Sequence, residues 1–98
     1  MGLGTQQKAF VKAVGRLIIY AYDFGYELSF GDAWAKDGHM ENSKHYDRLA
    51  IDLNLFINGE YKTATEDHAP LGEYWENIGG IWGGNFTNKD GNHYEWPR

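Results

Sequence analysis

Two histidines and two aspartates have the chemistry of a metal site, although they are spread along the sequence. Asp52 lies between Ile51 and Leu53 in the most apolar segment of the chain. A carboxylate in such a place is costly unless it is paired or binds a cation. His45 lies seven residues earlier, on the turn that is expected to enter the same strand. A chain reversal near residue 45 would bring its imidazole to the face that carries Asp52.

A polar stretch near the end of the sequence supplies further candidates. Asp90, His93 and Glu95 are close together there, and His93 and Glu95 would share one face of a strand. A catalytic zinc takes three protein ligands and keeps one position for water, and another carboxylate can act as the base. From the residue types alone two interpretations stay open. One is a zinc site, and the other is a hydrogen-bonded His–Asp pair without a metal.

Composition limits the classes of function. The 98 residues include no cysteine, which excludes disulfides and thiolate metal sites. The formal net charge of −5 argues against a nucleic-acid partner. We expect one domain over residues 1–98, and a monomer. No apolar run reaches membrane-spanning length and no signal peptide is recognisable. The expectation is therefore a protein that is made in the cytoplasm, stays soluble and does not insert into a membrane.

The hydrophobic pattern predicts the elements that must position these side chains. Helical spacing of apolar residues indicates a helix over Thr5–Phe24, with Thr5 as its N-cap and Gly25 at its end. A second helix is expected from Pro70 until Gly79-Gly80. Alternation predicts strands at Tyr26–Trp34, Leu49–Ile57, Glu60–Thr63 and Asn92–Trp96, with a loop over Trp82–Gly91. The sum is an α+β fold in which helices pack on a small antiparallel sheet.

The strand Leu49–Ile57 has the clearest pattern in the chain. Its odd-numbered residues are apolar and are expected to face a core, whereas Ala50, Asp52 and Asn54 would share the opposite face. The small side chain of Ala50 leaves room beside Asp52. Asn58-Gly59 predicts a two-residue hairpin turn directly after this strand.

Two motifs in this order resemble a known family. Ser43-Lys44-His45 followed by Ala50-Ile51-Asp52 resembles the Ser-x-His-x4-Ala-x-Asp signature of the zinc family of D-alanyl-D-alanine carboxypeptidases and L-alanyl-D-glutamate endopeptidases. Asp90-Gly91-Asn92-His93-Tyr94 is similar to the second motif of that family, and Trp82–Phe86 to the tryptophan–glycine loop that leads into it. The resemblance extends from about Tyr26 to the end of the sequence.

The resemblance implies a function and a role for each site residue. His45, Asp52 and His93 would bind Zn²⁺, Asp90 would be the general base, and Ser43 would orient the first motif. The fold would be that of hedgehog and DD-peptidase domains. The substrate would be the peptidoglycan stem peptide, with the L-Ala–D-Glu bond cleaved as in phage endolysins, which reach the cell wall without a signal peptide.

The sequence departs from the family at two positions. Arg48 stands where many members have Gly, and Ala35 stands where many have an Arg that contacts the substrate. Lys36 or Arg48 would then serve as the substrate-binding cation. Alternative functions are a D-Ala-D-Ala carboxypeptidase or dipeptidase, and a zinc-containing binding module of the same fold. His39 and His68 are expected at the surface, and Glu95 is the alternative base.

Overall fold

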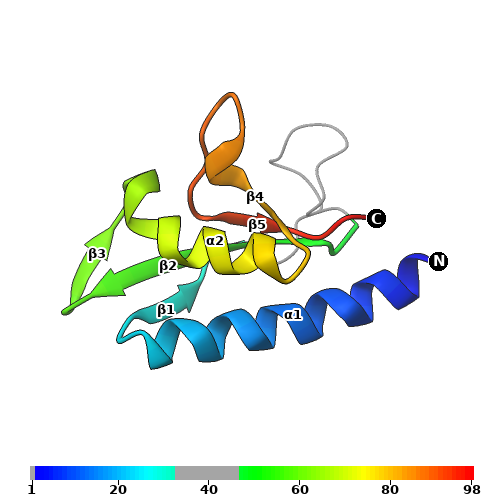
Figure 1. Ribbon diagram of the computed structural model, residues 1–98, viewed down its shortest axis with the longest axis horizontal. Coiled ribbons are helices and arrows are strands. Elements are labelled where there is room, and N and C mark those ends of the chain that lie inside the picture. Colours follow the sequence, from blue (N-terminus) through cyan, green and yellow to red (C-terminus); the bar gives the residue numbers. More distant parts are fainter. Residues whose placement is uncertain (1, 33–46) are drawn as a thin grey trace.

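The computed structural model describes residues 2–32 and 47–98, and in them the predicted α+β class is confirmed (Figure 1). Two α-helices, two short 3₁₀-helices and five strands make up the regular structure of these residues. In chain order the elements are α1 (Leu3–Asp23), β1 (Glu27–Phe30), β2 (Ala50–Ile57), β3 (Glu60–Lys62), the 3₁₀-helix η1 (Thr65–His68), α2 (Ala69–Asn77), β4 (Ile81–Trp82), the 3₁₀-helix η2 (Gly83–Asn85) and β5 (His93–Glu95).

Helix α1 begins earlier than its sequence indicated. Gly2, in extended conformation, is the N-cap, so the prediction of Thr5 as N-cap is wrong, and Thr5 is exposed in the first turn. The reason is that Leu3 continues the apolar stripe and packs against the core. The predicted end of the helix is confirmed, since Gly25 follows it with φ of 93°, a conformation that favours glycine.

Strand β2 is the centre of the sheet. The sheet has the order β1-β2-β5-β4, and β3 also pairs with β2. All these pairings are antiparallel. The predicted Asn58-Gly59 turn joins β2 to β3, with φ of 53° and 80° at its two residues. β1 is shorter than the predicted strand Tyr26–Trp34, of which residues 33 and 34 lie outside the described part of the chain.

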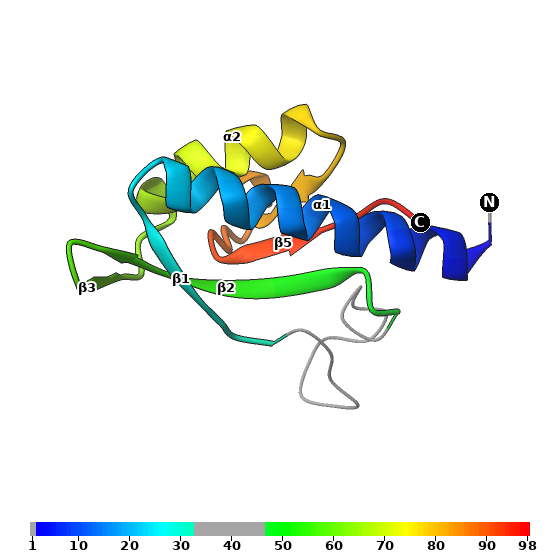
Figure 2. The same ribbon diagram turned by 90° about the horizontal axis from the view of Figure 1, so that it is seen from below.

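Both helices cover the same face of the sheet (Figure 2). The odd-numbered residues of β2 point toward them, and Ile51, Leu53 and Leu55 are buried as predicted, as is Leu49 just before the strand. The core also contains five residues of α1, two of α2 and one residue each of β4 and β5: Phe10, Ala13, Val14, Leu17, Ala21, Leu71, Trp75, Trp82 and Tyr94. The even-numbered residues of β2 therefore lie on the face that the helices leave uncovered.

Part of the predicted loop 82–91 is regular structure. Trp82 belongs to β4, and Gly83–Asn85 form η2. The Trp82 ring explains why glycines surround it, because a Cβ on Gly72 or Gly84 would lie 2.1 or 2.2 Å from a ring atom. Trp82 is a packed core residue.

Candidate metal centre

The pairing of β2 with β5 brings Asp52 and His93 together. Asp52 lies directly opposite His93 in the register. On one side of this pair the Leu53 N–H donates to Asn92 O, and further along the Trp96 N–H donates to Leu49 O. Asp52 and His93 are therefore a non-hydrogen-bonded pair, the kind in which opposing side chains approach most closely. The Asp52 Oδ1 atom lies 3.4 Å from His93 Nδ1.

The backbone of Asp52 is also held from its other side. Its N–H donates to Asp32 O (2.6 Å), and its carbonyl accepts a hydrogen bond from the Gly31 N–H (2.8 Å). A Cβ on Gly31 would lie 3.1 Å from the Asp52 Cβ, so glycine permits this close approach. The carboxylate is thus carried by a backbone that is hydrogen-bonded in the middle of the sheet, which limits its movement.

Asp90 joins the pair from the loop before β5. Its N–H donates to Gly83 O (2.9 Å), and its carbonyl accepts from the His93 N–H (3.1 Å). One ligand atom each from Asp52, Asp90 and His93 lies within 4.8 Å of the other two. Asp52 is partly exposed, Asp90 is exposed and His93 is buried. Two carboxylates and one imidazole therefore converge at a place that solvent reaches from the side of Asp90.

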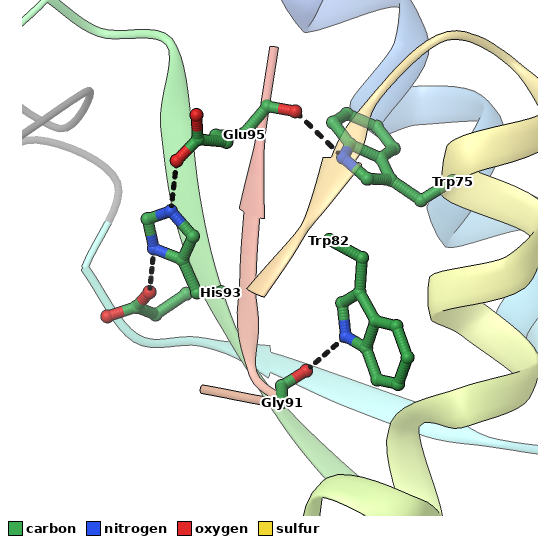
Figure 3. A network of polar contacts seen from close by, with 6 residues as sticks. Trp75, Trp82, Gly91, His93 and Glu95 are labelled. Carbon is green, nitrogen blue, oxygen red and sulfur yellow. Dashed lines mark hydrogen bonds and ion pairs between the residues drawn. The ribbon is translucent and has the colours of Figure 1, made fainter. Parts of the chain in front are cut away.

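The His93 ring has a carboxylate at each nitrogen (Figure 3). Nε2 lies 2.9 Å from Glu95 Oε1, and Nδ1 faces Asp52. Burial acts to lower the pKa of His93, but hydrogen bonds to Asp52 and Glu95 and the charges of both outweigh it and raise this pKa to about 9. In the protein without a metal, His93 is therefore a cation at neutral pH.

The donor set and its spacing fit a zinc ion. Zinc accepts histidine nitrogen and carboxylate oxygen. Two ligand atoms that each lie about 2.0–2.2 Å from a tetrahedral ion are about 3.3–3.6 Å apart. The 3.4 Å between Asp52 Oδ1 and His93 Nδ1 falls in this range and is longer than a good hydrogen bond. In the metal-free protein, protonated His93 places a positive charge between the carboxylates of Asp52 and Glu95. A bound zinc ion would supply positive charge in its place.

The other predicted site residues have different outcomes. His45, Ser43 and Lys36 lie outside the described residues, as do Ala35 and His39. Their predicted roles stay predictions. Arg48 is exposed in the turn before β2 and has φ of 59°, a left-handed conformation that glycine adopts more easily. This conformation gives a physical reason for the glycine that many members of the resembled family have there.

The prediction that His68 lies at the surface is wrong. His68 is 1% exposed, and its Nδ1 shares a hydrogen bond of 2.8 Å with the Tyr94 hydroxyl. Burial lowers the pKa of His68, in contrast to His93. The polar sequence around His68 suggested a surface position, but the 3₁₀-helix turns this one side chain inward. His68 thus supports β5 from the core face and is not part of the Asp52–Asp90–His93 group.

A family model described as D-alanyl-D-alanine carboxypeptidase matches residues 29–96, which is more than half of the chain. The chain belongs to the D-alanyl-D-alanine carboxypeptidase family. The match includes all three residues of the candidate centre and confirms the resemblance of the two motifs. Peptidases of this family are of the zinc type and act on peptidoglycan.

A sequence search of curated proteins gives no match. Among residues 2–32 and 47–98, no helix combines the length and the apolar character that a membrane crossing requires.

Proposed function

We propose that this chain is a zinc-dependent peptidase that hydrolyses the L-Ala–D-Glu bond of the peptidoglycan stem peptide. The observation that carries the proposal is the convergence of Asp52, Asp90 and His93 within 4.8 Å on the face of the sheet that the helices leave uncovered. Family membership supports the class of reaction. The choice of this bond follows the resemblance of the motifs to the zinc family of D-alanyl-D-alanine carboxypeptidases and L-alanyl-D-glutamate endopeptidases, which includes phage endolysins. In this proposal the chain acts as a single domain and as a monomer.

Each residue of the centre has one role in the proposal. Asp52 and His93 would hold the ion together with His45. A bound zinc would polarise the scissile carbonyl and activate water. Asp90 would take the proton from the attacking water and pass it to the leaving amine. Its exposed carboxylate, on a loop tied to Gly83 and His93 by backbone hydrogen bonds, is accessible to both.

A second bond is the alternative within the same family. The family description names D-alanyl-D-alanine carboxypeptidase, so removal of a terminal D-Ala is the second candidate. Both reactions are amide hydrolysis and need the same metal and base. They differ in the products, because endopeptidase cleavage frees a new amino group on D-Glu, whereas carboxypeptidase cleavage frees D-Ala.

Product analysis on purified peptidoglycan tests the proposal. Digestion followed by mass spectrometry is expected to show stem peptides that begin with D-Glu, and zinc analysis is expected to give about one ion per chain. Release of D-Ala alone would transfer the assignment to the second candidate. A protein that binds zinc without any turnover would be a binding module, and a protein that binds no divalent metal would contradict the proposed centre.

Asp90→Asn separates the base from a ligand. If Asp90 is the base, the variant keeps zinc and fold but loses about 100-fold or more in kcat. Asp23→Asn is the matched control, because Asp23 is an exposed aspartate at the end of α1, outside the group. Loss of zinc from Asp90→Asn would instead make Asp90 a ligand. Full activity in Asp90→Asn would exclude it from both roles.

A further inference from the structure

Glu95 provides the second carboxylate that contacts the His93 ring, and it contacts a different ring nitrogen from Asp52. Glu95 is two residues beyond His93 on β5, so both side chains lie on the same face of the strand. Glu95 Oε1 lies 2.9 Å from His93 Nε2, on the side of the ring opposite the nitrogen that faces Asp52. Its side chain is 15% exposed, which makes it less accessible than that of Asp52 at 21%.

The ring of His93 can have only one orientation in this arrangement. Both ring nitrogens already face a carboxylate, so turning the ring over would replace each nitrogen by a carbon. An ionised carboxylate only accepts hydrogen bonds, and the contact at Nε2 is shorter (2.9 Å) than the contact at Nδ1 (3.4 Å), so Nε2 is the nitrogen that keeps its proton when the ring is neutral. In the neutral imidazole Nδ1 then keeps its lone pair, directed at the side of Asp52.

We propose that Glu95 is a positioning residue that holds His93 as the Nε2–H tautomer and thereby makes Nδ1 the nitrogen that binds the metal. This inference rests on the proposed function, because it concerns how the same centre is built. Metal-binding histidines commonly donate their second N–H to a carboxylate, which sets the tautomer and makes the ligand more basic. Glu95 would not touch the substrate, and it would not be the base.

The surroundings of Glu95 fit such a role. Ala50 is its cross-strand neighbour and is completely buried, so the space for the carboxylate exists because that neighbour is small. On the other side, the Trp75 Nε1–H donates to the Glu95 carbonyl at 2.9 Å (Figure 3). A tryptophan of the core thus fixes the backbone of Glu95, and Ala50 leaves its side chain room to reach His93.

Glu95→Ala and Glu95→Gln test the role. Removal of a carboxylate of this kind typically weakens metal binding by about 10–100-fold. We expect Glu95→Ala to weaken zinc binding by this factor in a competition titration, with Glu95→Gln intermediate because its amide oxygen can still accept from Nε2–H. Long-range ¹H–¹⁵N NMR of the zinc-loaded wild type is expected to show a protonated Nε2 and a metal-bound Nδ1 on His93.

Two further variants make the test specific. Glu76→Gln changes a carboxylate that accepts hydrogen bonds from the Trp82 N–H and from Asn85, away from the centre, and it should leave zinc affinity unchanged. Ala50→Val leaves Glu95 intact but occupies its space, and it should also weaken zinc binding. It serves as the second variant if Glu95→Ala folds poorly.

The possible contrary results have distinct meanings. A metal-bound Nε2, or zinc affinity that is unchanged in Glu95→Ala, overturns the positioning role. Unchanged affinity together with lost turnover would make Glu95 the base. If the wild type proves inactive on peptidoglycan, the proposed function fails, yet zinc affinity and the His93 tautomer still decide the role of Glu95. If it binds no zinc, Nδ1 is not a metal ligand and the inference is overturned together with the proposed centre.

Discussion

Gly83→Ala should damage the centre without changing any of its side chains. A Cβ at position 83 would lie 2.3 Å from the Asp90 carbonyl oxygen and 2.8 Å from the His93 Cβ. Ordinary contact begins at about 3.4 Å, so the Asp90 backbone must move by about 1 Å. The methyl group meets backbone and a strand residue, which cannot rotate away as the end of a flexible side chain could.

Two magnitudes follow from this displacement. Overpacking of this kind typically destabilises a protein by about 1–3 kcal/mol. A misplacement of about 1 Å at a reacting group can reduce the rate about 100-fold. Gly83→Ala is therefore expected to lower the free energy of unfolding modestly and kcat strongly, because Asp90 would no longer hold its position relative to His93.

The assay must separate the loss of fold from the loss of geometry. Denaturant unfolding gives the stability change, and kcat per folded molecule is measured on a stem peptide well below the melting temperature. Gly84→Ala is the matched control: its Cβ would lie 2.2 Å from the Trp82 ring, and the three atoms nearest to it all belong to that ring rather than to Asp90 or His93. The reasoning is refuted if Gly83→Ala keeps the wild-type kcat, or if Gly84→Ala loses as much kcat per folded molecule.

Two other predictions concern Arg48 and the metal-free protein. Arg48→Gly should be about 1 kcal/mol more stable than Arg48→Ala in denaturant unfolding, because Ala keeps the left-handed φ of 59° that glycine tolerates. Both variants should raise KM if Arg48 contacts the substrate, and equal KM values in both variants and the wild type would contradict that contact. Since the pKa of His93 is about 9 when folded and 6.5 when unfolded, its contribution to the stability of the metal-free protein is complete below pH 6.5 and is lost as pH rises through 9. The loss should be on the order of 3 kcal/mol, and His93→Gln should remove it; a flat wild-type profile would show that His93 is not held as a cation.

Strand and turn patterns predicted the parts of the fold that depend on local sequence. The alternation in β2 correctly separated the core face from the face of Asp52, and Asn58-Gly59 correctly located the hairpin. Thr5 was assigned as a cap because its residue type suits one, but burial of Leu3 extends the helix beyond it. A capping preference is worth about 1 kcal/mol, so the packing of a partly buried leucine is enough to offset it.

Only part of the candidate centre could be predicted from the sequence. Residue types and the motifs singled out Asp52, Asp90 and His93, which the fold brings together. The role of Gly83 depends on a loop that returns to β5, and no local pattern shows that contact. The polar residues next to His68 in the sequence wrongly indicated a surface position. His68 is buried beside Tyr94, its hydrogen-bond partner, which is distant in the sequence.

The register between β2 and β5 connects the core to the chemistry. A slip by one residue would turn Tyr94 to the outer face and His93 to the core, and the Asp52–His93 pair would be lost. Contacts on the inner face oppose such a slip, because the completely buried Tyr94 shares a hydrogen bond with His68 and packs edge-on against Trp75. The Trp75 indole also donates to the Glu95 carbonyl. Residues that never reach the centre thus hold the strand that places His93 between its two carboxylates.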